Sequence, residues 1–272
     1  MSSFSSPRPP RRTASVHVGP VTIGPGHPLA LISGPCVVED PETMDRTAEG
    51  LVELCRRHEV PLIFKSSYEK DNRTAADAYR GPGLQAGLAA LERLKERFGL
   101  PVTSDVHRVS DVEPAARVLD LIQVPALLCR QTSLLEAAGR AGRPVNVKKG
   151  QFIAPQAMKG AVDKLGEAEV LLTERGSCFG HERLVCDLTC LSVLRSLGCP
   201  VCVDAGHASN RRDEIPLLAR AGVAAGADAL FVEVHPDPGR ARCDGSRTLS
   251  LLELEEILPG LVGLARAVRE QG

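Results

Sequence analysis

The stretch Pro61-Leu62-Ile63-Phe64-Lys65-Ser66-Ser67-Tyr68-Glu69-Lys70-Asp71-Asn72-Arg73-Thr74 joins a short apolar run to a cluster of cations. The apolar run at 61–64 predicts a buried strand. Lys65, Lys70 and Arg73 follow it within nine positions. A solvated turn can carry such charges. Three cations directly after a buried strand nevertheless favour a pocket for a multiply charged anion, because phosphates bind to fixed donors and positive charge.

The same order, an apolar run followed by a polar loop and an amphipathic helix, recurs along nearly the whole chain. It predicts strands at 29–33, 61–64, 101–105, 119–123, 145–148, 169–173, 200–204 and 229–233. The predicted helices cover 41–58, 83–98, 109–118, 133–141, 155–165, 187–197, 212–225 and 250–270. Eight strand–helix units in 272 residues favour a (β/α)8 TIM barrel over an open doubly wound sheet.

The chain shows no composition break that would divide it into two domains. We expect a single (β/α)8 barrel catalytic domain over residues 16–272, in which residues 16–27 form a small hairpin that closes the bottom of the barrel. Residues 1–15 are rich in Ser, Pro and Arg and contain no apolar segment, so they predict a short, disordered N-terminal extension and no signal peptide.

Composition excludes several classes of partner. The net charge of −1 gives no reason to expect a nucleic acid or an anionic membrane as partner, and no apolar run approaches the length of a membrane span. Nine cysteines without a secretory signal fit the reducing cytoplasm. The pair Cys199-Pro200-Val201-Cys202 favours core packing over a redox role. No Gly-x-Gly-x-x-Gly follows the first strand, so no nucleotide cofactor is expected.

Chemistry in such barrels sits at the carboxyl ends of the strands, and the side chains predicted there are of two kinds. Lys65, Lys70, Lys148 and Arg175 could hold anions, whereas Cys36, His207, Glu233 and Asp244 could bind a metal. A thiolate, an imidazole and two carboxylates suit a divalent ion such as Fe, Zn, Mn or Co.

These four possible ligands would come from the first, seventh and eighth strands, which become neighbours when the barrel closes. Each residue alone has an ordinary alternative: Cys36 could be core, Glu233 could pair with a lysine, and Asp244 before Gly245 could make a turn. As a convergent set they favour a metal site.

At this point the sequence resembles a known family, the 3-deoxy-D-manno-octulosonate 8-phosphate synthases, from about Leu29 to the C-terminal helix. The motifs that carry the resemblance are Ser-Gly-Pro-Cys at 33–36, Phe-Lys-Ser-Ser-Tyr-Glu-Lys-Asp-Asn-Arg at 64–73, Tyr-Arg-Gly-Pro-Gly-Leu at 79–84, Ser-Asp-Val-His at 104–107, Ile-Gln-Val-Pro-Ala at 122–126, Cys-Arg-Gln-Thr at 129–132, Asn-Val-Lys-Lys-Gly-Gln-Phe at 146–152, Glu-Arg-Gly at 174–176 and Glu-Val-His-Pro-Asp-Pro at 233–238.

The resemblance implies a transferase that condenses phosphoenolpyruvate with D-arabinose 5-phosphate and water, the 3-deoxy-8-phosphooctulonate synthase reaction of lipopolysaccharide biosynthesis, in a homotetramer. Lys65, Lys70, Lys148 and His207 are the catalytic residues that we expect. The phosphoenolpyruvate contacts implied are Lys65, Ser67, Lys70, Gln123, Lys148 and Arg175, and the sugar-phosphate contacts are Asn72, Arg73, Thr74 and Asp105. Cys36, His207, Glu233 and Asp244 match the ligands of the metal-dependent branch.

Two departures from the family pattern keep alternatives open. The loop that follows His207 is short, as in synthases that use erythrose 4-phosphate, so the same condensation on another aldose phosphate is the alternative function. Cys243-Asp244-Gly245 is typical of the metal-free branch, which carries Asn in place of Cys36. Cys36 decides for the metal-dependent branch, because Cys243 need not face the ion. A non-catalytic barrel that senses a sugar phosphate is a third possibility, and the combined cation and metal sets argue against it.

Overall fold

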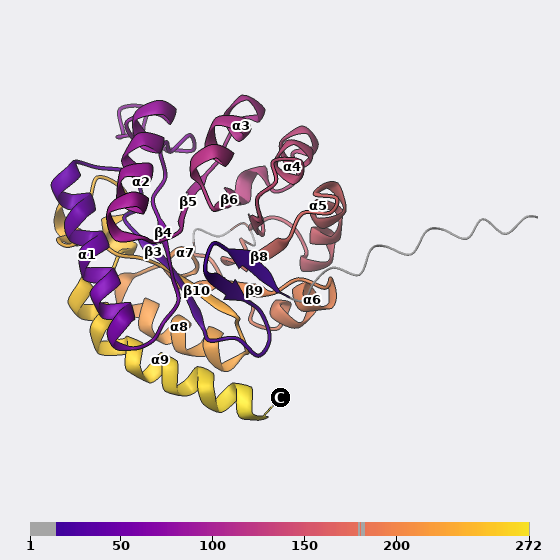
Figure 1. Ribbon diagram of the computed structural model, residues 1–272. Coiled ribbons are helices and arrows are strands. Elements are labelled where there is room, and N and C mark those ends of the chain that lie inside the picture. The colour runs from indigo at the N-terminus through magenta and orange to yellow at the C-terminus, as the bar shows by residue number, and fades with distance from the viewer. Residues whose placement is uncertain (1–14, 179, 181–182, 272) are drawn as a thin grey trace, which may run out of the picture.

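The computed structural model describes residues 15–178, 180 and 183–271. Eight parallel strands close into a barrel in the order β10-β3-β4-β5-β6-β7-β8-β9, and helices surround them (Figure 1). The predicted (β/α)8 TIM barrel is therefore confirmed. The barrel strands are β3 (Ala30–Gly34), β4 (Leu62–Lys65), β5 (Val102–Asp105), β6 (Leu121–Val124), β7 (Val145–Lys148), β8 (Val170–Glu174), β9 (Val201–Asp204) and β10 (Ala229–Glu233).

The helices follow the strands in alternation. They are α1 (Pro41–Arg57), α2 (Leu84–Phe98), α3 (Val109–Val118), α4 (Thr132–Gly139), α5 (Met158–Lys164), α6 (Cys190–Ser196), α7 (Ala205–Ala208), α8 (Ile215–Ala224) and α9 (Leu251–Gln271). Short 3₁₀ turns occupy Ala126–Leu128, Pro155–Ala157, Arg212–Glu214, Pro238–Arg240 and Gly245–Arg247. The start of two predicted helices, at 155–157 and at 212–214, is thus 3₁₀ rather than α. No helix within the described ranges combines the length and apolar character that crossing a membrane requires.

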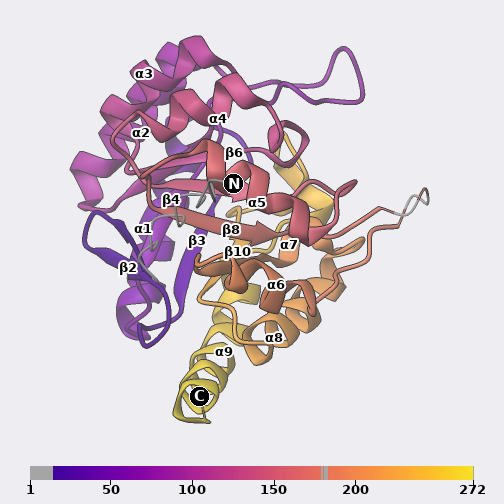
Figure 2. The same ribbon diagram turned by 90° about the vertical axis from the view of Figure 1, so that its right-hand side faces the viewer.

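A hairpin of β1 (Val16–Val18) and β2 (Val21–Ile23) packs against one end of the barrel. Its apolar side chains share a buried cluster with Ala30, Leu121 and Ala229, which begin strands β3, β6 and β10. The hairpin therefore covers the amino-terminal end of the barrel, as the sequence predicted, and lies on the side opposite the β4–α2 and β8–α6 connections (Figure 2). The predicted tail at 1–15 lies outside the described residues except for Ser15.

The predicted start of the fourth strand was wrong by two residues. Leu119 belongs to the end of α3, because its backbone N–H donates to the carbonyl of Ala115. Asp120 then accepts hydrogen bonds from the Val102 backbone N–H and from the Lys95 ammonium. Because of these contacts, β6 begins at Leu121. The strand register that places Gln123 opposite Asp105 follows from that start.

Candidate active site

A cavity at the carboxyl end of the barrel is lined by six of the fourteen predicted site residues. Its lining includes Lys70, Asn72, Asp105, Lys148, Arg175 and His207, together with Gln151 and the segment Pro125–Leu127. Lys65, Ser67 and Gln123 lie close beneath, fully buried. The β4–α2 and β8–α6 connections both extend from this end of the molecule (Figure 2).

Two buried polar atoms in the lining of this cavity are available to bind a ligand. The Arg175 side chain is buried, yet its Nη1 has no hydrogen-bond partner among the described residues, and neither has Oε1 of Gln151. Burial lowers the pKa of Arg175 from its usual value, although nearby Asp204 acts in the opposite direction. Unpaired buried polar groups cost free energy, and an anion bound here would supply the missing acceptor for Arg175.

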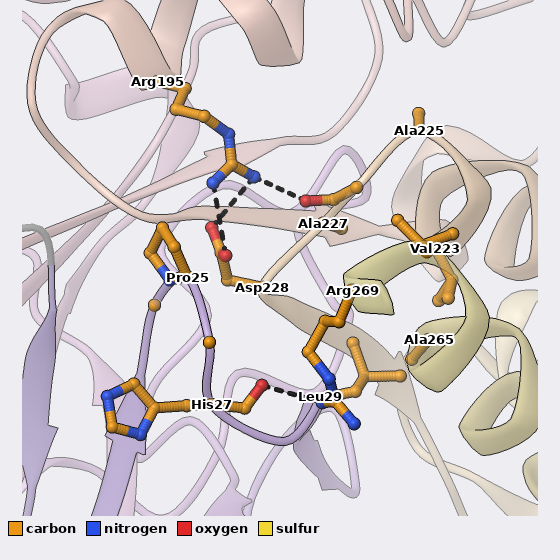
Figure 3. A pocket seen from close by; sticks show the side chains of 14 residues that line it. Pro25, His27, Leu29, Arg195, Val223, Ala225, Ala227, Asp228, Ala265 and Arg269 are labelled. Atoms are coloured by element: carbon orange, nitrogen blue, oxygen red, sulfur yellow. Dashed lines mark hydrogen bonds and ion pairs between the residues drawn. The ribbon is translucent and has the colours of Figure 1, made fainter. Parts of the chain in front are cut away.

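A larger hollow of about 580 Å³ lies at the opposite, amino-terminal end, and its charges are already paired (Figure 3). Arg195 contacts Asp228 at 3.2 Å and donates to the carbonyl of Gly226, and Arg269 donates to the carbonyl of His27. None of its lining atoms is among the buried polar atoms that lack a partner. Size alone therefore does not identify the functional site in this chain.

Asp105, at the end of β5, collects three donors. Its Oδ2 accepts from Ser67 Oγ at 2.8 Å and from Lys70 Nζ at 3.2 Å, and its Oδ1 accepts from Gln123 Nε2 at 2.7 Å. Burial by itself would raise its pKa, but Lys70 and Lys65 hold the pKa well below the ordinary value. The sequence predicted Asp105 at the sugar phosphate. The structure places it among the residues predicted for phosphoenolpyruvate, where it fixes Lys70.

A buried polar chain continues from Asp105 across the barrel. Asn146 Nδ2 donates to Gln123 Oε1 at 2.9 Å, and Thr173 Oγ1 donates to Asn146 Oδ1 at 2.7 Å. Each hydrogen bond defines the direction of the next, so the Gln123 amide turns its NH₂ toward Asp105. Asn146 and Thr173 were missing from the predicted site residues, although Asn146 stands as a polar residue inside a predicted strand.

Asp204, at the end of β9, contacts two residues predicted to be catalytic. Its carboxylate lies 2.6 Å from Lys148 Nζ and 2.9 Å from His207 Nδ1, and it also accepts from the His207 backbone N–H. The charges of His207 and Lys148 outweigh the effect of burial and lower the pKa of Asp204. The backbone bond starts α7, so His207 lies in a short helix that was not among the predicted helices. Asp204 was recognised as a strand end but was missing from the predicted site residues.

The four predicted metal ligands form two overlapping groups joined by Asp244. Cys36 and Asp244 belong to one group, and His207, Glu233 and Asp244 form the other; within each group the donor atoms lie within 4.8 Å of one another. The predicted adjacency of the first, seventh and eighth barrel strands is confirmed, because β9, β10 and β3 are neighbours. Cys243 completes the first group, although the sequence did not lead us to count it among the ligands.

The donor set fits a divalent ion. His207 offers Nε2 while its Nδ1 is held by Asp204, and a carboxylate behind a ligating histidine is the usual support of a metal site. Burial, the Cys243 contact and Glu233 together raise the pKa of Cys36, so without a cation this residue remains a thiol. Burial would raise the pKa of Asp244, but the charge of His207 and the hydrogen bond from Cys36 lower it.

Lys65 supports the site from below. Its Nζ donates to Glu233 Oε1 at 2.7 Å and to the Cys36 carbonyl at 2.9 Å, and the Lys65 side chain is fully buried. Gly34 allows this arrangement, because a Cβ at that position would lie 2.2 Å from the Lys65 carbonyl oxygen. Lys65 is therefore beneath the cavity and already paired, unlike Arg175.

The predicted sugar-phosphate residues Asn72, Arg73 and Thr74 lie in the β4–α2 connection. Asn72 lines the cavity, and Arg73 donates from Nη1 to Cys243 Sγ at 2.8 Å while its buried Nε has no partner among the described residues. Thr74 is exposed and, within the described ranges, makes no side-chain hydrogen bond. The structure thus brings two of the three to the site.

The fold and this site define a (β/α)8 enzyme with a cationic substrate pocket next to a candidate metal site. Residues 10–270 match the DAHP synthetase I family, and the chain belongs to that family. Three curated relatives are each named 2-dehydro-3-deoxyphosphooctonate aldolase. That of Desulfatibacillum aliphaticivorans is 49% identical over 91% of this chain and 96% of its own length. Those of Desulfotalea psychrophila and Syntrophotalea carbinolica are each 47% identical, over 92% and 94% of this chain and 94% and 97% of their own lengths.

Proposed function

We propose that the chain condenses phosphoenolpyruvate with D-arabinose 5-phosphate and water, giving 3-deoxy-D-manno-octulosonate 8-phosphate and phosphate. The observation that carries this proposal is the set of buried cations around one cavity, in which Arg175 Nη1 has no acceptor among the described residues. The chain also matches relatives named for the aldolase over nearly their full length. A multiply charged substrate explains why so many cations face one small space.

The cations supply position and charge for the reaction. Arg175, Lys148 and Lys70 hold the carboxylate and phosphate of phosphoenolpyruvate, so that its C3 faces the aldehyde of the open-chain sugar. A bond forms between C3 and the aldehyde carbon, water adds at C2, and phosphate leaves by cleavage of the C2–O bond. Holding two substrates in line is itself a large part of catalysis, and fixed positive charge stabilises the leaving phosphate.

Asp105 and Asp204 fix the cations in this scheme. Asp105 holds Lys70 and Asp204 holds Lys148, each through a buried ion pair. Asp204 also orients His207, whose Nε2 is directed toward Glu233 at 3.9 Å. Asn72 and Arg73 would receive the phosphate of the sugar, with Arg73 Nε as an available donor.

The metal is part of the proposal. Cys36, His207, Glu233 and Asp244 would hold a divalent ion such as Fe, Zn, Mn or Co, and such an ion can orient an aldehyde or lower the pKa of a bound water. The mixed sulfur, nitrogen and oxygen donors support it. We further propose that the enzyme is a cytoplasmic homotetramer that serves lipopolysaccharide biosynthesis. The nine cysteines of the sequence are consistent with a reducing compartment.

The test of this function is phosphate release from phosphoenolpyruvate with each aldose phosphate in turn. We expect turnover with arabinose 5-phosphate and much less with erythrose 4-phosphate, the substrate that the short connection after His207 would favour. Lys148→Ala should abolish phosphate release, whereas Lys159→Ala, which removes an exposed lysine paired with Asp163, should leave it unchanged. No turnover with arabinose 5-phosphate would contradict the proposal, and turnover with erythrose 4-phosphate alone would select the alternative.

A further inference from the structure

Cys243 lies directly against the candidate metal ligands. Its Sγ is 2.8 Å from the Sγ of Cys36 and 3.3 Å from Oδ2 of Asp244, and the residue is only 2% exposed. The three side chains offer donor atoms that all lie within 4.8 Å of one another. A second sulfur is thus present in addition to the four predicted ligands, and it is as close to Asp244 as Cys36 is, at 3.2 Å.

The contacts of Cys243 hold its sulfur beside the other possible ligands. Arg73 Nη1 donates to this sulfur at 2.8 Å. The Cys36 carbonyl is occupied by Lys65, whereas the two sulfur atoms face each other and Asp244. A cation between these three side chains would meet sulfur on two sides.

We propose that Cys243 is a further metal ligand beside Cys36 and Asp244, in addition to the four ligands proposed above, and that its sulfur makes the site prefer a thiophilic divalent ion. Thiolate donors select zinc over manganese and magnesium, which prefer oxygen. This inference rests on the metal proposed above but not on any substrate. It also explains the Cys-Asp-Gly sequence at 243–245 in a chain that carries Cys36.

The experiment is a cobalt titration of the full, metal-stripped chain without substrates. Each thiolate bound to Co²⁺ adds a charge-transfer absorption in the near ultraviolet. We expect Cys243→Ser and Cys36→Ser each to remove about half of the wild-type intensity, as equal contributions of two thiolates require. Zinc affinity, measured by competition with a chelator, should fall at least about tenfold in Cys243→Ser. Cys55→Ser, at a buried cysteine of α1, is the matched control and should change neither quantity.

The outcomes separate the two proposals. If wild type shows no thiolate–cobalt absorption, the metal itself is refuted and the role of Cys243 with it. If Cys36→Ser removes the whole band and Cys243→Ser keeps wild-type intensity and zinc affinity, only the role of Cys243 is refuted. Cys243→Ala is measured in parallel, and circular dichroism must show that each variant is folded. Phosphate release is not part of this experiment, so the result does not depend on the proposed reaction.

Discussion

Asp204 is the residue on which the geometry of the site depends most, and its removal gives the most demanding prediction. Its carboxylate contacts both Lys148 and His207 and is fully buried. We predict that Asp204→Ala destabilises the folded protein by about 3–5 kcal/mol, the usual cost when one partner of a buried ion pair is removed and the other charge stays buried.

An exposed pair provides the comparison. Lys159 and Asp163 are also 2.6 Å apart, but their side chains are 62% and 51% exposed, whereas Lys148 and Asp204 are 7% and 0% exposed. An exposed helical pair of this spacing contributes about 0.3–0.5 kcal/mol. Asp163→Ala should therefore cost a small fraction of what Asp204→Ala costs, although the two ion-pair distances are equal.

Urea unfolding of wild type and both variants measures the free energies. Asp204→Asn, which keeps the size of the side chain, then tests function through phosphate release. We expect kcat/KM to fall by about 10²-fold, because a small displacement of a catalytic group has a cost of that order. Equal destabilisation by Asp204→Ala and Asp163→Ala, or wild-type turnover in a folded Asp204→Asn variant, would refute the reasoning.

Three further predictions concern other parts of the site. The pKa of Asp105 is depressed, so its contribution to stability is present above the ordinary pKa of about 3.9 and is lost as the pH falls below that value. Urea unfolding between neutral and acid pH should therefore show that the free energy of unfolding falls less steeply with pH in Asp105→Asn than in wild type. An equal pH dependence in the two proteins would count against this. Arg175→Gln should raise the KM for phosphoenolpyruvate more than the KM for the sugar phosphate, which steady-state kinetics with each substrate varied would show. Equal changes in the two KM values would mean that the unpaired Nη1 does not serve phosphoenolpyruvate in particular. A chelator should remove activity and Fe(II), Mn(II) or Zn(II) should restore it; full activity in chelator would remove the metal from the mechanism.

The sequence predicted the fold well because each unit carries its own local signal. A short, mostly apolar run is buried in the barrel wall, and the amphipathic helix that follows covers it. Errors occurred where a polar contact decides a boundary, as at Asp120, which takes up the Val102 backbone N–H before β6 begins. The partner of such a side chain is distant in sequence, so the local pattern does not reveal it.

The site was predicted as a set of residues but not as a set of contacts. Strand ends identified Lys70, Lys148 and His207, because all strands of a barrel end on one face. The pairing of Lys148 with Asp204 depends on the register of strands two positions apart in the barrel, and this is a property of the closed sheet. Cys243 was left outside the site because a loop residue gives no indication of the direction of its side chain.

The most direct test of the proposed condensation follows the oxygen that joins phosphorus to C2 of phosphoenolpyruvate. This oxygen is labelled with oxygen-18, and the substrate is incubated with the protein and arabinose 5-phosphate. We predict that mass spectrometry finds the label in the released phosphate, together with an eight-carbon sugar-acid phosphate. Unlabelled phosphate, or no consumption of the two substrates, would contradict the proposed function.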